Sequence, residues 1–356
     1  MTTKYLSWSL VIPTYQRETV LLRCLHLAAE QTYPPKEIIV VDGSPQWQHT
    51  YEIVRQQLVP YHPQIHWQYV QANRLSSAAQ RNQGIDLTTS DVVFLIDDDS
   101  LMYPDCAEKV MHIYTADTEQ QVAGIMPFLS AIPPDQVQQQ STNTPNSFNL
   151  LKLKMKLRGM AKRWIKDNDI FIPYDFKFYI YPLPSQLENM PVHCVPMMHG
   201  ARMSYRKAIL QTIRFEETLE RYAVNEDNDV CYRASRCGLL LQALDANICH
   251  LQAHHGRLSR FATTALWGLN QVVLHRFHGS DLEKFKHQFV KLVWRRIFTQ
   301  TLKDFLDRRW RFPSTRGAMF ALRHYQTVLS HTPEELKTWY PQFQQQLIEH
   351  DQHFQE

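Results

Sequence analysis

Apolar residues in the first hundred positions fall into short continuous runs that alternate with stretches of helical spacing. The runs are rich in β-branched residues and predict strands at 10–12, 37–41, 65–70 and 92–96. Apolar residues three to four positions apart predict helices at 20–31, 51–58 and 76–87. Alternating strands and helices favour a parallel sheet with right-handed crossovers, and ligands of such sheets bind beyond the carboxyl ends of the strands. The loops after residues 12, 41 and 96 should therefore face one cleft.

The pattern changes in the second half of the chain. Residues 135–147 are rich in Gln, Ser, Thr, Asn and Pro, which indicates a solvated loop. Residues 151–158 alternate strictly between apolar and basic, and both a strand with one wet face and a basic amphipathic helix running on to Lys166 fit this segment. A helix is predicted at 230–239. From Arg257 onward the pattern is helical and basic, which indicates a helical appendage.

Composition and charge narrow the class of protein. With 356 residues and 44% hydrophobic content, the chain can bury a core of one large α/β domain plus an appendage, or of two domains. The net charge of +3 is too small to argue for a nucleic-acid partner. Residues 257–356 nevertheless hold 15 Lys and Arg against 9 Asp and Glu, a net charge of +6. This tail, with the 152–166 stretch, predicts either a peripheral contact with anionic membrane or a solvated helical face.

Cysteine usage and apolar run length bear on the compartment. The six cysteines form no C-x-x-C pair, and a chain of this size needs no disulfide staples, so reduced thiols are expected. Residues 1–9 have no apolar segment of signal-peptide length, and no run reaches the 18 or so residues that span a bilayer. We therefore expect a cytoplasmic protein, either free or peripheral at the inner face of the membrane.

Three consecutive acids, Asp97, Asp98 and Asp99, directly follow the predicted strand at 92–96. On an extended chain Asp97 and Asp99 point the same way, and carboxylates held together favour a bridging divalent cation such as Mg²⁺ or Mn²⁺. A solvated acidic turn or a helix cap is the alternative. Phosphatases with a strand-end nucleophile share the arrangement. The absence of G-x-G-x-x-G and of G-x-x-x-x-G-K-[ST] argues against a Rossmann dehydrogenase and a P-loop enzyme.

Five segments in a fixed order carry a resemblance to a known family. They are 10–15 (LVIPTY), 39–44 (IVVDGS), 79–84 (AQRNQG), 94–99 (FLIDDD) and 225–229 (NEDND). Over about residues 8–255 the sequence resembles family 2 glycosyltransferases. The resemblance implies an α/β GT-A fold, with a mainly parallel central sheet flanked by helices. It also implies a nucleotide-diphospho-sugar donor and inversion at the anomeric carbon.

For the donor, the resemblance implies a specific set of contacts. Asp42 would accept a hydrogen bond from the base, although an Asx turn with Gly43 is the alternative. Pro13 and Thr14 would border the base and ribose, or form a plain turn after a strand. Arg81 would hold the nucleotide part, a task that suits a planar guanidinium.

For the metal and the acceptor side, the resemblance implies a further set. Asp99 would bind Mn²⁺ or Mg²⁺, and Asp97 would lie near the ribose or the metal, whereas Asp98 receives no role. His250 is the favoured additional metal ligand, with His254 and His255 in reserve. Arg257 is a candidate contact for the diphosphate.

The catalytic base implied by the resemblance is Asp227, with Glu226 beside it and Gly200 in a small-residue segment of the acceptor pocket. A carboxylate can take the proton of an attacking hydroxyl late, as the hydroxyl acidifies in the transition state. The alternative for the acids at 226–229 is a helix N-terminus favoured by the helix dipole.

Together these features predict two domains and one activity. Residues 1–256 would form the GT-A domain, with 1–100 binding the nucleotide-sugar and 101–256 supplying the acceptor side and the base, and 257–356 would be the appendage. The expected activity is sugar transfer to a glycan, lipid-linked or other acceptor in cell-surface polysaccharide or glycoconjugate synthesis. The alternatives are a non-catalytic nucleotide-sugar-binding protein and a metal-dependent phosphohydrolase.

Overall fold

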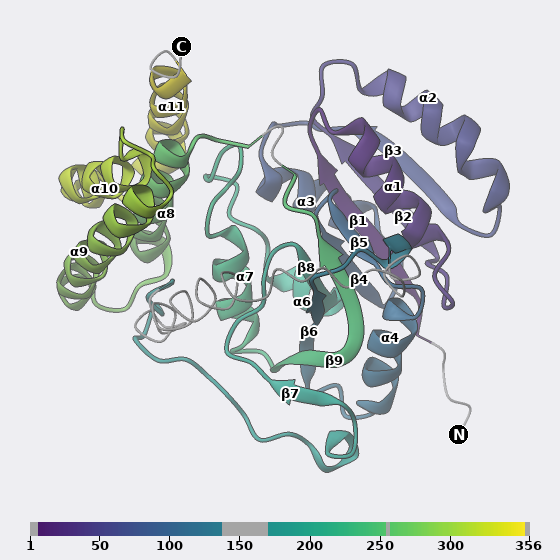
Figure 1. Ribbon diagram of the computed structural model, residues 1–356. Helices are drawn as coiled ribbons and strands as arrows, with labels where there is room; N and C mark the ends of the chain where they lie inside the picture. Colours follow the sequence, from purple (N-terminus) through teal and green to yellow (C-terminus); the bar gives the residue numbers. More distant parts are fainter. Residues whose placement is uncertain (1–5, 137–169, 254–256, 353–356) are drawn as a thin grey trace, which may run out of the picture. The chain divides into compact units, whose positions relative to one another are not determined.

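The computed structural model describes residues 6–136, 170–253 and 257–352 (Figure 1). The first hundred residues form four parallel strands connected by helices, in the predicted order. The strands are β1 (Trp8–Thr14), β2 (Glu37–Asp42), β3 (His66–Gln71) and β4 (Val92–Ile96). The helices are α1 (Glu18–Ala29), α2 (Trp47–Gln57) and α3 (Ser77–Leu87), with a 3₁₀ turn η1 (Val59–Tyr61) after α2.

The second part extends the same sheet with strands of both directions. Its strands are β5 (Ser100–Met102), β6 (Val122–Ser130), β7 (Val192–Cys194), β8 (Arg202–Arg206) and β9 (Leu239–His250). Its helices are α4 (Cys106–Ala116), η4 (Ser185–Leu187), α6 (Lys207–Thr212) and α7 (Glu226–Ala234). The sheet has the order β3-β2-β1-β4-β8-β6-β9-β5, with β7 paired to β9. The mainly parallel sheet predicted from the sequence is confirmed. It also contains antiparallel pairs, because β8 runs antiparallel to β4 and to β6.

Central strands are buried along their whole length because helices cover the sheet. Every residue of β2 and of β4 is buried, which explains why these segments are continuous apolar runs rather than alternating ones. Trp8 on β1 packs its ring 4.5 Å from that of Phe94 on β4. At Gly84 on α3, a Cβ would lie 2.3 Å from the Val11 side chain, so the absence of a side chain lets α3 pack directly on β1.

The helix predicted at 230–239 is wrong in both of its bounds. α7 begins at Glu226 and ends at Ala234, and Leu239 is the first residue of β9. The helix starts earlier because the acids of its first turn are stabilised by the helix dipole. It stops earlier because Leu239 pairs with Val122 on β6. The segment 151–158 and most of the predicted loop 135–147 lie outside the described residues.

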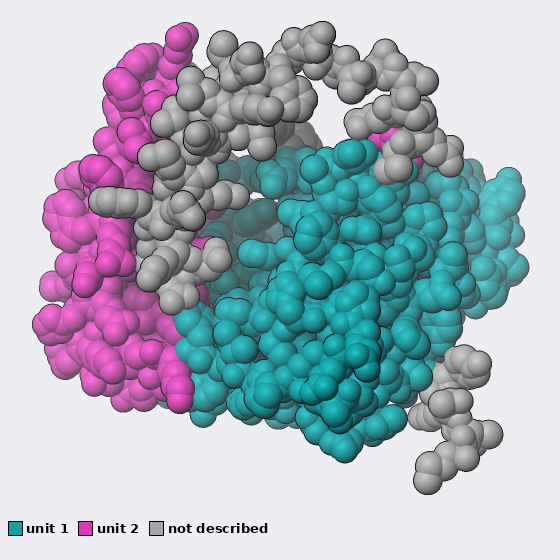
Figure 2. Space-filling view, turned by 60° about the horizontal axis from the view of Figure 1, so that its bottom comes forward, with its two compact units in different colours: residues 1–134, 178–259, 334–356 teal, residues 135–177, 260–333 magenta. Residues whose placement is uncertain are grey.

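Four long helices follow the sheet. They are α8 (Arg260–His278), α9 (Leu282–Leu306), α10 (Pro313–Ser330) and α11 (Pro333–Gln352), so the expected helical C-terminal region is present. By contacts, residues 1–134, 178–259 and 334–356 form one compact unit, and residues 135–177 and 260–333 form another; Figure 2 distinguishes the two by colour. α11 thus groups with the sheet, whereas the functional division at residue 257 stays a prediction. None of the described helices is both long and apolar enough to cross a bilayer.

Candidate active site

Strand pairing brings the predicted donor residues to one edge of the sheet. β1 is parallel to both β2 and β4, and Thr14 at the end of β1 lies opposite Asp42 at the end of β2. Asp97 follows the last residue of β4 at the same edge. Two acids about 55 residues apart in sequence therefore emerge on neighbouring parts of one sheet edge, as the parallel topology requires.

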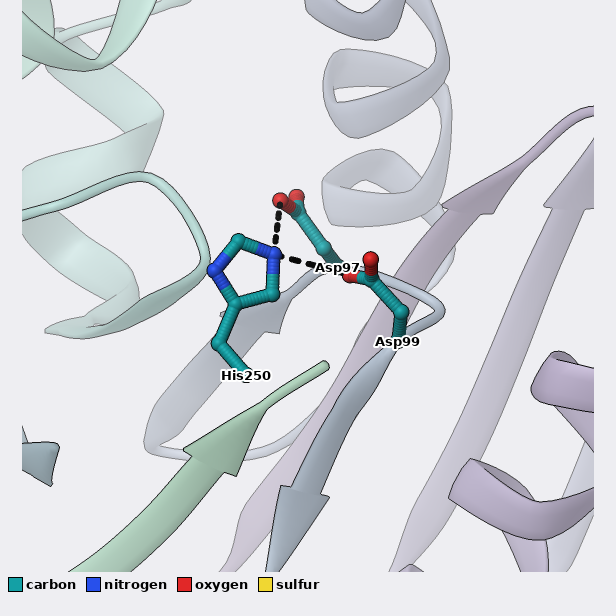
Figure 3. Close-up of side chains that lie close together, drawn as sticks. All are labelled: Asp97, Asp99 and His250. Atoms are coloured by element: carbon teal, nitrogen blue, oxygen red, sulfur yellow. Dashed lines mark ion pairs between the residues drawn. The ribbon is translucent and has the colours of Figure 1, made fainter. Parts of the chain in front are cut away.

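Asp97, Asp99 and His250 converge at this edge, as Figure 3 shows. His250 is the last residue of β9, and its antiparallel pairing with Ser100 on β5 places it beside the acids. The imidazole Nε2 lies 2.9 Å from Asp99 Oδ1 and 3.8 Å from Asp97 Oδ2. One candidate ligand atom from each residue lies within 4.8 Å of the others. Two carboxylates and an imidazole are a donor set that suits Mn²⁺ and also accommodates Mg²⁺.

Hydrogen bonding at the cluster fits a metal site. Among the described residues, the buried Asp99 Oδ1 and His250 Nε2 make no hydrogen bond, even though they lie close to each other. Asp99 Oδ2, by contrast, accepts a hydrogen bond from the Ala253 N–H at 2.8 Å. The atoms that face the centre of the cluster are thus the unsatisfied ones, and a cation would satisfy them.

Electrostatics at the cluster favour a positive charge. Burial by itself raises the pKa of Asp99, but the His250 imidazole, the Ala253 N–H and the Arg17 guanidinium outweigh it, so this pKa is lowered. Burial lowers the pKa of His250, yet the carboxylates of Asp99 and Asp97 outweigh burial and raise it. The cluster therefore attracts a positive charge, which either a proton on the imidazole or a metal ion can supply.

Asp98, to which the sequence assigned no role, is a buried structural link. It accepts a hydrogen bond from Thr14 Oγ1 at 2.8 Å and pairs with Arg17 at 2.9 Å. Burial raises its pKa to about 6, although Arg17 and Thr14 act in the opposite direction. Arg17 also lies 3.8 Å from Asp99. Arg17 was not predicted from the sequence. Its position three residues after Thr14, in a loop expected at the ligand-binding edge of the sheet, could have identified it.

Arg81 connects the acids of β4 with those of α7. It is buried on α3, pairs with Asp97 at 2.7 Å, and donates a close hydrogen bond to Glu226. A longer hydrogen bond of 3.3 Å reaches the Gly200 carbonyl. Glu226 also accepts a hydrogen bond from Ser77 Oγ at 2.8 Å. A cation between two carboxylates fixes the distance between these two parts of the chain.

Asp227 is held in the first turn of α7 by backbone donors. Its Oδ2 accepts a hydrogen bond from the Gly200 N–H at 3.0 Å, and its Oδ1 accepts one from the Asn228 N–H at 2.8 Å. A Cβ at Gly200 would lie 3.1 Å from both the Cβ and the Oδ2 of Asp227. The missing side chain therefore permits the close approach that orients this carboxylate. Asn225, before the helix, has a positive φ of 77°.

Asp42 is buried and both of its oxygens are engaged. Oδ1 accepts a hydrogen bond from the Ser44 N–H at 2.7 Å, which is the geometry of an Asx turn. Oδ2 accepts one from the Tyr69 hydroxyl at 2.5 Å, and burial together with Asp42 raises the pKa of Tyr69. Tyr69 lies on β3 and was not singled out from the sequence. Trp47 stacks on its ring with centroids 6.4 Å apart, so Asp42 faces an aromatic cluster.

The remaining predicted residues divide into two groups. Arg257 Nη2 lies 3.8 Å from Asp99, at the edge of this cluster, and its contact with a donor diphosphate stays a prediction. His254 and His255 lie outside the described residues. The described contacts join Asp97, Asp99, His250, Arg81, Glu226, Gly200 and Asp227 in one continuous set, and they join Thr14 to Asp98 beside it.

Known proteins resemble this chain in sequence and in fold. Residues 9–179 match the family model described as Glycosyl transferase family 2. No curated protein matched the chain in a sequence comparison. Among solved structures, the mannosyltransferase PcManGT from Pyrobaculum calidifontis, in complex with GDP-Man and Mn²⁺, is 13% identical with a TM-score of 0.52; the alignment covers 91% of this chain and 88% of that one.

Two further structures are similar over less of their own length. GalNAc-T7, solved with UDP, GalNAc and Mn²⁺, is 14% identical with a TM-score of 0.50, and the alignment covers 80% of this chain and 55% of that chain. Staphylococcus aureus TarS is 15% identical with a TM-score of 0.44, covering 80% of this chain and 42% of that one. The fold and the family match agree: through residues 9–179 the chain belongs to glycosyl transferase family 2, and it is a glycosyltransferase with a GT-A-like fold.

Proposed function

We propose that the chain transfers a sugar from a nucleotide-diphospho-sugar to a hydroxyl of a glycan or lipid-linked acceptor, with inversion at the anomeric carbon. The observation that carries this proposal is the continuous set of contacts that joins the metal-type cluster to Asp227 through Arg81 and Glu226. The family match ends at residue 179, so the assignments at Glu226, Asp227 and His250 rest on this geometry and on the motif. Cell-surface polysaccharide or glycoconjugate synthesis is the process in which such a transfer fits.

Asp227 is the proposed catalytic base. The acceptor O–H bond breaks as the new bond to the anomeric carbon forms and the bond from that carbon to the diphosphate breaks on the opposite face. The proton passes to the Asp227 carboxylate, whose orientation is held by the N–H groups of Gly200 and Asn228. Glu226, bound to Arg81, keeps the first turn of α7 in place beside Asp97.

Asp99, Asp97 and His250 are the proposed ligands of a divalent cation, Mn²⁺ or Mg²⁺. Such an ion, when bound, would supply charge stabilisation to the departing diphosphate. Two of the similar solved structures, PcManGT with GDP-Man and Mn²⁺ and GalNAc-T7 with UDP, GalNAc and Mn²⁺, hold this ion together with a nucleotide, which supports the same chemistry here. Arg17 and Arg257 add positive charge at the same oxygen cluster.

We propose that the nucleobase of the donor and its ribose contact Asp42, Pro13 and Thr14. Because Tyr69 already donates to Asp42, a base N–H that binds there must share or displace this hydroxyl. We further propose that the chain makes a peripheral contact with anionic lipid through its basic C-terminal part, which carries the excess of Lys and Arg.

Donor binding and transfer test the proposal separately. Thermal unfolding of the full chain is measured with UDP-, GDP- and dTDP-sugars, each with and without Mn²⁺, because a ligand that binds the folded state raises the midpoint. We expect one nucleotide class to raise it in a metal-dependent manner. If no nucleotide-sugar protects the chain under any metal condition, the donor assignment is wrong.

Asp227→Asn is then compared with Asp86→Asn, an acid-to-amide change at an exposed side chain. We expect Asp227→Asn to keep donor protection and to lower the transfer rate by about a hundredfold or more, as for the loss of a general base. Asp86→Asn should transfer at the wild-type rate. Full transfer by Asp227→Asn would overturn the base assignment. Donor binding by a wild-type chain that transfers to no acceptor hydroxyl would instead favour a non-catalytic binding protein.

A further inference from the structure

One face of α9 exposes large apolar side chains along most of its C-terminal half. Trp294, Phe298, Leu302 and Phe305, here called the outer stripe, are 59%, 68%, 47% and 54% exposed. Their spacing of four, four and three residues aligns them on one side of the helix. Trp310, which is 66% exposed just after the helix, lies next to Phe305 with ring centroids 5.9 Å apart. Contiguous apolar surface of this kind marks an interaction site.

The outer stripe is separate from the core of the helical unit. The buried apolar residues of α9 are Phe285, Phe289, Leu292 and Val293, and this helix packs with α8 and α10. The outer stripe follows these residues along the helix and lies on the opposite side, and the buried positions beside it, Gln300 and Asp304, are polar. α9 is thus apolar on two opposite faces, and only one of them is used within the unit that 260–333 helps to form.

Charge along the same helix identifies the kind of partner. The sequence holds no acid between Glu283 and Asp304, and the exposed Lys291 and Arg295 lie three residues before and one residue after Trp294. Arg308 and Arg311 follow the C-terminal end of the stripe, also exposed. Aromatic and aliphatic side chains flanked by Lys and Arg suit the boundary between lipid headgroups and acyl chains. A second copy of this face would bring like charges together, which opposes self-association.

We propose that the outer stripe inserts into the interfacial region of an anionic lipid membrane, with α9 lying along its surface. Trp294 and Phe298 enter the headgroup boundary, and the flanking Lys and Arg side chains contact anionic headgroups. This inference deepens the peripheral contact proposed above by identifying the face that makes it. It does not depend on sugar transfer, so each can fail alone.

The test uses the full chain and vesicles of phosphatidylcholine, with or without phosphatidylglycerol. Co-sedimentation is compared for the wild type, the double variant Trp294→Ser with Phe298→Ser, and the control Tyr61→Ser, whose side chain is 75% exposed in the other unit. We expect the wild type and the control to bind the anionic vesicles. The double variant should bind at least about tenfold less, because it lacks the two aromatic side chains that insert into the membrane. Unchanged thermal midpoints and unchanged donor protection show that the variants are folded.

Three outcomes would overturn the proposal. The first is wild-type protein that binds neither vesicle, and the second is a double variant that binds as well as the wild type. The third is a wild-type oligomer that binds no vesicle and becomes monomeric in the double variant, which would assign the outer stripe to a second copy of the chain. Binding that survives high salt in the wild type, but not in the double variant, would support insertion over attraction by charge alone.

Discussion

Asp97, Asp98 and Asp99 are consecutive, yet each side chain has different surroundings. Asp97 is 27% exposed and pairs with Arg81, whereas Asp98 is 4% exposed and is held by Arg17 and Thr14. Asp99 is 1% exposed and faces His250. Just past the end of a strand, successive side chains still point in different directions, so three identical residues acquire different neighbours. A motif of three acids therefore contains one acid held in structural contacts and two that lie beside His250, where we propose a cation site.

Gly200 is expected to control the position of Asp227. In Gly200→Ala the new Cβ would lie 3.1 Å from the carboxylate, which must shift or lose its hydrogen bond from the residue 200 N–H. Displacing a reacting group by even about 1 Å is costly, so we expect the transfer rate to fall at least about tenfold. Steady-state kinetics with saturating donor measure this change.

The donor dissociation constant of Gly200→Ala provides the internal control, because the added Cβ lies beside Asp227 and leaves in place the Gly200 carbonyl that accepts from Arg81. It should stay within about twofold of the wild-type constant, a difference below 0.5 kcal/mol or so. Weakened donor binding with an unchanged maximal rate would show that Gly200 contributes to donor binding rather than to the position of the catalytic base Asp227.

At the scale of elements, the turn between α9 and α10 depends on one buried acid. Asp304 is fully buried and accepts hydrogen bonds from Ser314 Oγ at 3.1 Å and from the Thr315 N–H at 3.0 Å, in the first turn of α10. It thus caps a helix that begins after Phe312, a residue with positive φ. The N-cap residue Phe312 makes no side-chain hydrogen bond to the helix, and the Asp304 carboxylate of α9 accepts from its first turn instead.

Asp304→Ala should destabilise the chain by about 2–4 kcal/mol, because it leaves buried donors without an acceptor. The matched control is Asp307→Ala, one turn later, whose partly exposed carboxylate pairs with Arg309 and should contribute less than about 1 kcal/mol. Urea unfolding followed by circular dichroism measures both values. Equal effects of the two substitutions would contradict the capping role.

At the scale of the whole molecule, one buried histidine should make stability depend on pH. His275 is fully buried, donates from Nε2 to the Ile172 carbonyl at 2.7 Å, and stacks on Phe285. Burial, followed by the nearby His278, lowers its pKa from 6.5 to about 4, although the bond to Ile172 acts in the opposite direction. The unfolded chain therefore binds a proton at a higher pH than the folded chain does.

This contribution is fully present above pH 6.5 and is lost as the pH falls toward 4, by about 3 kcal/mol in total. We expect His275→Gln, which can still donate to Ile172, to lose less stability than the wild type over this range. His287→Gln, at an exposed position, should follow the wild-type profile. Chemical unfolding at several pH values measures the difference between the profiles, and parallel profiles for wild type and His275→Gln would contradict it.

Local sequence was sufficient for the first hundred residues because each element there has its own periodic signal. The strand predicted at 92–96 has those bounds in the structure, and the helix predicted at 76–87 begins one residue later, at Ser77. The prediction for 230–239 was wrong because a short helix ran into a strand whose partner, β6, lies more than a hundred residues earlier. Leu239 alone carries no signal of that partner.

The sequence by itself determined the family, the parallel half of the sheet and the acids at its edge, because apolar period and motif order are properties of neighbouring residues. Only the tertiary structure decided which acids meet which cations. Arg17 with Asp98, Arg81 with Glu226, and His250 with Asp99 are each separated by 80 or more residues. Such pairs depend on how the sheet and its helices pack, and side-chain chemistry alone permits many other pairings.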